Sequence, residues 1–440
     1  MFVFCFYVLP ACRKEKVPEP YKPSNAHRAY VFSLEQSGLA DTALGRDWIS
    51  ASKKALQAPI VISLPFEEVF FMDPAVPNAV AYGFDVKKGQ KIDVEAAIQS
   101  IKQGRIFIDL FRTTGSSRNE WISVASANKD DNRLAFEARS ESRYFLRLQP
   151  ELLRGGECRL AIRVVPSLGF PVKGYDESAI LSGFGEPRDG GLRRHHGVDI
   201  FAPRHTPVLA PIRAYVRRVG ESERGGRHVW LHDSRRSLYL YFAHLETQEA
   251  VEHTYVNQGQ VIGTVGNTGN ARTTPPHLHF AIYFSGEGPV DPHYFIASTN
   301  PVPEPVTVDL ASLGKWIRVK KRKIPLMSTP EKNQNSTTFL DLHTPMRVVG
   351  AVKEMYRIFL PNGESGYVRA DDVETMEQNI ILEKASCIRA LKTLPATQAP
   401  AREYINAGEK FAILARFGTY WFVRTQMGNR GWLEDFSTSQ

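Results

Sequence analysis

The chain has 440 residues, which is too long for a single hydrophobic core and enough for about three units of roughly 100–150 residues. Its apolar (42%) and aromatic (11%) fractions exclude a mainly disordered protein. The net charge of +8 suits anionic partners, but the basic residues are scattered and the densest run, 320–323, is short. We therefore expect a solvated basic face and no nucleic-acid partner.

The cysteines exclude two further kinds of site. They stand at positions 5, 12, 158 and 387, and no Cys-x-x-Cys pair occurs. A thiolate zinc site and a thioredoxin-like motif are therefore not expected. Cys158 and Cys387 fall in different predicted units, and we expect both to be free, buried thiols.

Residues 1–26 are interpreted as a signal-peptide remnant followed by a tether. The apolar run up to Cys12 is shorter than the roughly 20 residues that a membrane-spanning helix needs, and it resembles the end of a signal-peptide hydrophobic region. Leu9-Pro10-Ala11-Cys12 resembles a bacterial lipobox, which implies an exported protein anchored by a lipid on Cys12. A simple cleaved N-terminus is the alternative. The following Lys-, Pro- and Glu-rich stretch suits a tether leaving a membrane surface.

Residues 27–57 are predicted to be helical and residues 58–166 to form a β-sandwich. Asp41 is a candidate cap for a helix from Thr42 to Leu56, with Trp48 on its apolar side. In 58–166, seven or more short runs alternate in the manner of strands and are separated by Gly, Asn and Asp turns. This part resembles the jelly-roll sandwiches appended to secreted bacterial peptidases, and we expect an accessory, binding or spacing role.

Residues 167–300 contain three histidine-bearing pieces in β-rich surroundings. In the first, His195 and Asp199 are four residues apart, which places them on one face of an extended segment. Gly197 lies between them, where a bulky side chain would crowd an ion. In the third, His277 and His279 flank Leu278 in a strand pattern, so that both imidazoles share one face.

The second piece is weaker evidence by itself. His244 follows a hydrophobic strand, where a lone histidine is more often a core or edge residue. A His-x-His in a strand is likewise often a pair of ordinary surface histidines. Only the combination of the three pieces favours one open metal site for hydrolysis.

The spaced motifs of 170–298 resemble those of the lysostaphin/LytM-type zinc metallopeptidases, which cut peptidoglycan peptides. The motifs that carry this resemblance, in chain order, are Leu181-Ser-Gly-Phe-Gly185, His195-x-Gly-x-Asp199, Thr206-Pro-Val-x-Ala210, Tyr241-x-Ala-His-Leu245, Val256-x-x-Gly-Gln-x-Ile-Gly263, Gly266-Asn-Thr-Gly269 and His277-Leu-His-Phe280. Such a series is far more specific than a single His-x-His.

The resemblance implies a role for each site residue. His195, Asp199 and His279 match the ligands of one Zn²⁺, and His244 and His277 match the two active-site histidines that bind no metal. His196 fills a variable place. Two histidines and one carboxylate form a catalytic zinc site with an open position, where zinc activates water and a histidine serves as general base. In this scheme His277 is the expected base and His244 the expected donor to the oxyanion, although the two roles could be exchanged.

Residues 315–376 and 383–437, which follow a Pro-rich joint at 301–305, resemble a repeated bacterial SH3-like barrel. Gly363-Glu-Ser-Gly-Tyr-Val368 and Gly428-Asn-Arg-Gly-Trp-Leu433 occupy matching places in the two units. Such units imply binding to cell-wall peptide, and a packing role is the alternative. The whole chain is therefore predicted to be mainly β: a jelly-roll-like sandwich, a central antiparallel metallopeptidase domain and small SH3-like barrels.

The predicted function is zinc-dependent endopeptidase activity on peptidoglycan peptides or cross-bridges in the cell envelope. One alternative is a non-catalytic cell-wall-binding activator of a peptidoglycan amidase. Another is a cell-surface adhesin or scaffold with a vestigial catalytic domain. Because all five expected site positions are filled, the enzyme is favoured over both.

Overall fold

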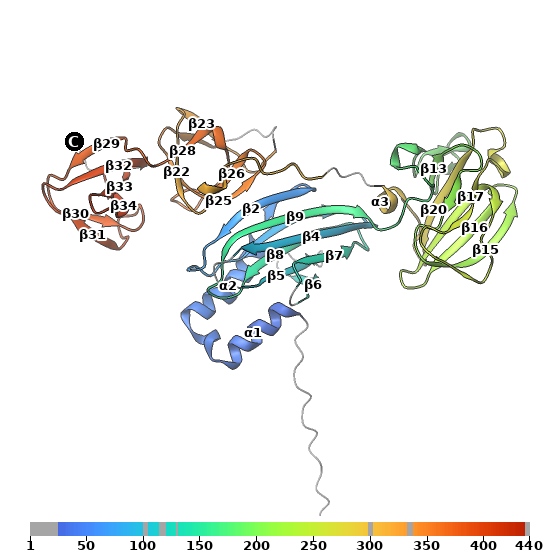
Figure 1. Cartoon of the computed structure of the whole chain (residues 1–440), viewed down its shortest axis with the longest axis horizontal. Helices are drawn as coiled ribbons and strands as arrows, with labels where there is room; N and C mark the ends of the chain where they lie inside the picture. Colours follow the sequence, from blue (N-terminus) through green and yellow to red (C-terminus); the bar gives the residue numbers. More distant parts are fainter. Residues whose placement is uncertain are drawn as a thin grey trace, which may run out of the picture.

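The computed structural model describes residues 25–99, 104–113, 120–128, 131–297, 302–331 and 338–435. The expected lipid anchor at Cys12 lies outside these residues. The described chain is dominated by antiparallel sheets, as Figure 1 shows, and the predicted mainly-β fold class is confirmed. Within the same ranges, no helix is both long and apolar enough to cross a bilayer.

In the described part of the chain, the helices α1 (Ala26–Gln36) and α2 (Ala43–Gln57) precede the sandwich. The expectation that Asp41 caps the second helix is wrong. Thr42 is the cap, because its hydroxyl accepts a hydrogen bond from the Gly45 amide at 3.1 Å. Trp48 of α2 is buried, and its indole N–H donates to the Pro150 carbonyl at 2.8 Å, which docks the helix on the sandwich.

Two sheets pack face to face in the part that follows. The first sheet contains, in spatial order, β1 (Ile60–Val61), β3 (Val80–Val86), β8 (Ser142–Pro150), β5 (Ile106–Thr113) and β6 (Trp121–Ser126). The second contains β2 (Phe66–Met72), β9 (Gly156–Pro166), β4 (Gln90–Gln99) and β7 (Arg133–Glu137). Alternate residues of both sheets, such as Ile92, Val94, Leu146 and Leu148, fill the core between them.

The second sheet continues into the next unit of the chain. β25 (Pro345–Val352) pairs with β2, and β26 (Met355–Phe359) and β27 (Ser365–Arg369) extend the sheet, which reaches nine strands with β22 (Trp316–Val319) and β28 (Val373–Thr375). Behind this joint, the buried Glu68 carboxylate accepts hydrogen bonds at 2.6 Å from both Arg357 Nε and the Tyr82 hydroxyl. The 315–376 unit is thus joined to the sandwich by a shared sheet and a buried ion pair.

The remaining C-terminal strands complete two small units. The first also contains β22 (Trp316–Val319), β23 (Lys323–Leu326), β24 (Thr338–Asp341) and β28 (Val373–Thr375). The second is a six-stranded sheet of β29 (Ile381–Lys384), β32 (Lys410–Phe417), β33 (Tyr420–Thr425), β34 (Arg430–Glu434), β30 (Arg389–Lys392) and β31 (Ala401–Ile405).

The two described cysteines are both free, but only one is buried. Cys158, on β9, lies in the sandwich core, where burial raises the pKa of its thiol. Cys387 is exposed, so the expectation that it is buried is wrong. It lies in the bend between β29 and β30, where no sheet covers it.

The central sheet positions the histidine pieces. Its strands, in spatial order, are β10 (Ile180–Ser182), β13 (Val198–Phe201), β20 (His277–Phe284), β17 (Leu238–Gln248), β16 (Gly226–Asp233), β15 (Ala214–Ser222) and β18 (Tyr255–Val256). Three shorter strands also belong to it: β14 (Pro207–Leu209), β19 (Val261–Val265) and β21 (Gly288–Val290). The unit also contains α3 (His293–Ile296) and a separate ribbon of β11 (Pro187–Arg188) and β12 (Arg193–Arg194). Figure 1 shows β20, β17, β16 and β15 side by side.

The two faces of this sheet differ in chemistry. Leu231, Leu240, Phe280 and Ile282 point to one face and are fully buried in the core of the unit. Because side chains alternate along a strand, the residues between them point to the opposite face. That open face carries the candidate site.

Candidate active site

Asp199 and His279 are direct cross-strand partners on β13 and β20. Partners in register share a face of the sheet, so both side chains point to the open side. His279 Nδ1 lies 2.9 Å from Asp199 Oδ1. Ile200 and Leu278, the next pair in the same register, point into the core, which determines the face on which the site forms.

His195 reaches the same point from outside β13. It lies before the strand, which begins at Val198 after a bend at Gly197, so the extended segment expected from His195 to Asp199 is not one straight strand. A Cβ on Gly197 would stand 2.4 Å from the Phe280 carbonyl oxygen and 3.0 Å from His279 Cε1. The glycine is therefore needed for close approach of the chain to β20 and to the His279 ring.

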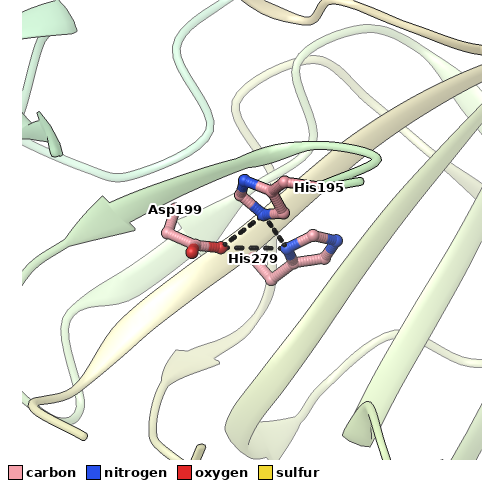
Figure 2. Close-up of side chains that lie close together, drawn as sticks. All are labelled: His195, Asp199 and His279. Atoms are coloured by element: carbon pink, nitrogen blue, oxygen red, sulfur yellow. Dashed lines mark hydrogen bonds and ion pairs between the residues drawn. The ribbon is translucent and has the colours of Figure 1, made fainter. Parts of the chain in front are cut away.

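Three donor atoms converge where these pieces meet. His195 Nε2 lies 3.0 Å from His279 Nδ1 and 3.1 Å from Asp199 Oδ1, and Figure 2 shows all three atoms directed at one point. A tetrahedral zinc ion with bonds of about 2.0–2.1 Å would separate such donors by about 3.3 Å. Among the residues that the structure describes, this is the group of at least three His, Cys, Asp or Glu donors close enough to hold a metal ion.

The surrounding groups orient these donors. The His195 Nδ1–H donates to the Gly183 carbonyl at 2.8 Å, which leaves the Nε2 lone pair for a metal. Arg188 Nη2 donates to Asp199 Oδ2 at 2.9 Å, so the other carboxylate oxygen, Oδ1, remains for the metal. Burial would raise the pKa of Asp199, but its close contacts with His195 and His279 outweigh burial and hold that pKa well below its usual range. An ionised carboxylate beside two imidazole nitrogens is a donor set that suits Zn²⁺.

His244 and His277 stand beside this cluster. The ring centroids of His244 and His277 are 5.1 Å apart, and those of His244 and His279 are 6.0 Å apart. His244 Nδ1 lies 2.9 Å from the Thr268 carbonyl oxygen, and His277 Nδ1 lies 2.9 Å from the Pro275 carbonyl oxygen. Since a carbonyl only accepts, Nδ1 carries the proton in both rings, and Nε2 is left as the free nitrogen.

His244 is also held in an uncommon backbone conformation. Its φ is +62°, in the left-handed region that few residues other than glycine adopt. The residue lies in β17 where the pairing with β16 shifts by a bulge, and its amide donates to the Gly225 carbonyl at 2.8 Å. Bulges beside active sites re-aim a side chain, and here the ring is directed towards Thr268 and the groove.

A groove of about 550 Å³ connects these residues. His195, Asp199, His279, His244 and His277 all line it, together with residues of the 270–274 loop. His196 also lines the groove, but it is exposed and is not part of the donor cluster. The structure therefore brings together all five expected site residues and leaves His196 apart from them.

Arg188 is the contributor that sequence reasoning missed. It belongs to β11, seven residues before His195, and nothing in its local pattern distinguishes it from the arginines at 193 and 194. Only the fold of the β11–β12 ribbon brings its guanidinium to Asp199. The one available signal was its position just after the Leu181–Gly185 motif.

The model of peptidase family M23 matches residues 193–292. This range contains the whole site except Gly183 and Arg188, which orient two of its ligands. The chain carries a peptidase family M23 domain. The family predicted from the spaced motifs is thereby confirmed.

The M23 domain is similar to curated peptidases of bacteria. It is 35% identical over 122 residues to the L-Ala--D-Glu endopeptidase of Bacillus subtilis, a match that covers 26% of this chain and 37% of the relative. It is 34% identical over 100 residues to the peptidoglycan DD-endopeptidase ShyC of Vibrio cholerae, covering 23% of this chain and 22% of the relative. The matches thus span well under half of either curated relative.

Among solved structures, the catalytic domain of lysostaphin from Staphylococcus simulans aligns with 33% sequence identity and a TM-score of 0.24. The alignment covers 26% of this chain and 87% of that domain. The similarity to all three proteins is thus confined to about a quarter of the chain.

Proposed function

We propose that this protein is a zinc-dependent endopeptidase that hydrolyses amide bonds in peptidoglycan peptides or cross-bridges. The observation that carries the proposal is the convergence of His195 Nε2, Asp199 Oδ1 and His279 Nδ1 in the groove of an M23 domain. Two histidines and a carboxylate leave a fourth position open, which distinguishes catalytic from structural zinc sites.

The metal and the protein would divide the chemistry. When bound, zinc would supply a Lewis acid that polarises the scissile carbonyl and lowers the pKa of water towards about 7. His195, Asp199 and His279 hold it, and Gly183 and Arg188 keep two of these ligands in orientation. The walls of the groove then place an extended peptide across the open position.

His277 is the proposed general base. Its Nδ1–H is held by the Pro275 carbonyl, so Nε2 is free to accept the proton of the attacking water. Once protonated at Nε2, the same ring can deliver that proton to the leaving amine. His277 lies two residues before His279 on β20, which keeps it on the same open face as the ligands.

His244 is not proposed as a permanent hydrogen-bond donor to the oxyanion. Burial, together with the neighbouring His277 and His279, lowers the pKa of His244 to about 4, so the ring is neutral near pH 7. Its single N–H then points at the Thr268 carbonyl, and Nε2 has no proton to donate. We therefore propose that His244 donates to the oxyanion only after Nε2 has taken up a proton from solvent, while His277 carries the proton of the attacking water to the leaving amine.

The substrate class rests on the relatives. Two of them are named as endopeptidases, one for an L-Ala–D-Glu bond and one for peptidoglycan. Peptidoglycan as the substrate would place this protein in the cell envelope. We also propose a lipid anchor at Cys12 and cell-wall binding by the 315–376 and 383–437 units, and both fit a location in the cell envelope. A non-catalytic activator would not need the intact set of ligands and active-site histidines, which favours the enzyme.

Metal content and peptide release test the proposal together. The full-length wild type, expressed with zinc, should carry about one metal ion per chain and release peptides from purified peptidoglycan. His279→Ala should lose both the zinc and the release. His196→Ala, a histidine of the same groove outside the donor cluster, is the matched control and should keep both. A wild type that carries zinc but releases no peptides would contradict the proposal.

A further inference from the structure

The open face of the central sheet continues beyond the metal cluster as a surface of aromatic rings. The strand register places five of them in one row across β18, β15, β16, β17 and β20: Tyr255, Tyr215, His232, Tyr239 and Tyr283. The adjacent row contains Trp230 and Tyr241, which are also direct partners. We call these two rows the aromatic face.

The aromatic face and the site share the same side of the same strands. On β20, His279, Ala281 and Tyr283 alternate with residues of the hydrophobic core, Phe280 and Ile282. They pair directly with Ala243, Tyr241 and Tyr239 of β17, respectively. Residues two apart along a strand are separated by roughly 6.6–6.8 Å. The two rows therefore lie about 7 Å and about 13 Å along the strands from the row that contains His279.

The rings contact one another in groups and remain partly open to solvent. Ring centroids are 4.4 Å apart for Trp230 and Tyr241, 5.4 Å for Trp230 and Tyr283, and 4.3 Å for the stacked pair His232 and Tyr239. All are half-buried except Tyr255, which is 59% exposed. No Leu, Ile or Val occupies a position of these two rows, whereas such residues fill the opposite face.

Arginines surround the far end of the aromatic face. Arg213 stacks over the Tyr255 ring at 4.4 Å, and Arg218 pairs in register with Trp230. Arg213 and Arg217 also line a hollow of about 740 Å³ that begins at Tyr215 and Tyr255. These exposed side chains provide hydrogen-bond donors beside the rings.

This combination fits a sugar chain. A pyranose ring has an apolar face of C–H groups that packs flat on an aromatic ring, and hydroxyl and acetamido groups that need hydrogen-bond partners at its edge. Tyr and Trp offer both an apolar ring and a polar group. A lipid surface would instead be served by protruding aliphatic side chains, which these rows do not have. Continuity with the candidate catalytic groove indicates which sugar polymer is relevant.

We propose that the aromatic face binds the glycan strand from which the substrate peptide hangs, and so holds that peptide near the metal cluster. This inference rests on the proposed function for the identity of the polymer. The binding itself requires neither zinc nor the active-site histidines, because none of them belongs to the two rows. Binding and cleavage can therefore be measured separately.

The first test uses a peptide-free probe, an oligosaccharide of β-linked N-acetylglucosamine, titrated into the full-length protein by calorimetry. The wild type should bind it, and Trp230→Ala and Tyr239→Ala should each weaken binding roughly tenfold or more, as expected for an aromatic ring at the centre of a contact. Tyr239→Phe keeps the ring and should retain binding. Tyr404→Ala removes a tyrosine that is 64% exposed on β31 and should have no effect.

The second test separates this inference from the proposed function. On a cross-linked peptide without sugar, Tyr239→Ala should cleave as the wild type does, whereas on intact peptidoglycan its KM should rise with little change in kcat. The inference would be overturned if the wild type does not bind the oligosaccharide. It would also be overturned if Tyr404→Ala weakens binding as much as Tyr239→Ala does. Binding that occurs only to anionic phospholipid vesicles would likewise overturn it. Sugar binding that depends on Tyr239 in a protein that cuts no peptide would support the inference and contradict the proposed function.

Discussion

Asp199 and His279 face each other across β13 and β20, with Asp199 Oδ1 2.9 Å from His279 Nδ1. Their register is the same one that buries Val198 opposite Phe280 and Ile200 opposite Leu278. A slip of β13 by one residue would turn Asp199 into the core and Val198 and Ile200 towards the open face, while β20 would stay in place through its pairing with β17. The packing of the sheet and the assembly of the donor cluster thus depend on the same pairing.

Gly197→Ala is expected to damage the cluster through the backbone. The new Cβ would stand 2.4 Å from the Phe280 carbonyl oxygen, so β13 or β20 must shift. We expect a loss of about 1–3 kcal/mol of stability, as for other overpacked positions, and weaker zinc binding. Chemical denaturation and metal titration would measure the two effects. Gly183→Ala, whose Cβ would meet only Glu186 Oε1 at 3.4 Å, is the control. Equal behaviour of the two variants would contradict the close-approach argument.

Arg188→Ala is expected to weaken zinc binding without removing a ligand. Arg188 donates to Asp199 Oδ2 and so holds the carboxylate in orientation. Loss of such an outer partner typically costs about 10–100-fold in metal affinity or activity. Competition with a chelator would measure this affinity. Arg194→Ala, on the neighbouring β12, removes an exposed arginine that donates to the Gly185 carbonyl and should bind zinc like the wild type. Unchanged affinity in Arg188→Ala would show that Asp199 needs no such support.

His27 is expected to make stability depend on pH. Burial, and secondarily the charge of Arg147, lowers the pKa of His27 to about 4, while its ring nitrogen Nε2 is 2.7 Å from Gln149 Oε1. Because the folded pKa is below the usual 6.5, the unfolded chain binds more protons between these values, and stability rises with pH. As pH falls from 6.5 towards 4, His27 should cost on the order of 2 kcal/mol.

Denaturation of the wild type and of His27→Phe over this pH window would isolate the contribution of His27. The difference in stability between the two proteins should change across the window in favour of the variant at low pH. His253→Phe, a replacement at an exposed histidine, is the control and should follow the wild type. A constant difference between the wild type and His27→Phe would exclude the linkage.

The Glu68–Arg357 pair is expected to join the sandwich to the unit at 315–376. Arg357→Met leaves a fully buried carboxylate with only the Tyr82 hydroxyl, and breaking a buried pair in this way costs about 3–5 kcal/mol. The double variant Glu68→Gln/Arg357→Met should lose less, because no charge is left buried alone. Thermal unfolding and limited proteolysis near residues 302–313 would report the loss. Arg143→Met breaks the exposed pair with Asp85 and should cost at most about 1 kcal/mol. Equal losses in Arg357→Met and Arg143→Met would refute a special role for the buried pair.

Some features followed from local chemistry and could be read from the sequence. The alternation around Leu278 predicted that His277 and His279 share a face, and β20 has this arrangement. The helix before the sandwich was also expected, but its cap was misplaced by one residue, because Asp41 and Thr42 are both good caps and only backbone geometry decides between them. Cys387 was misjudged because burial depends on what covers a bend, which neighbouring residues do not reveal.

The sequence by itself determined the mainly-β class, the family and the five side chains that line the candidate site, because strand periodicity and motif spacing are local properties. The tertiary structure decided how those side chains are arranged. It placed Asp199 opposite His279, bent the chain at Gly197 to return His195 to the cluster, and brought Arg188 to the carboxylate. It also aligned four tyrosines and His232 from five strands into one open row. Such arrangements depend on pairing between distant strands, and the packing of the core, not the spacing of residues along the chain, determines that register.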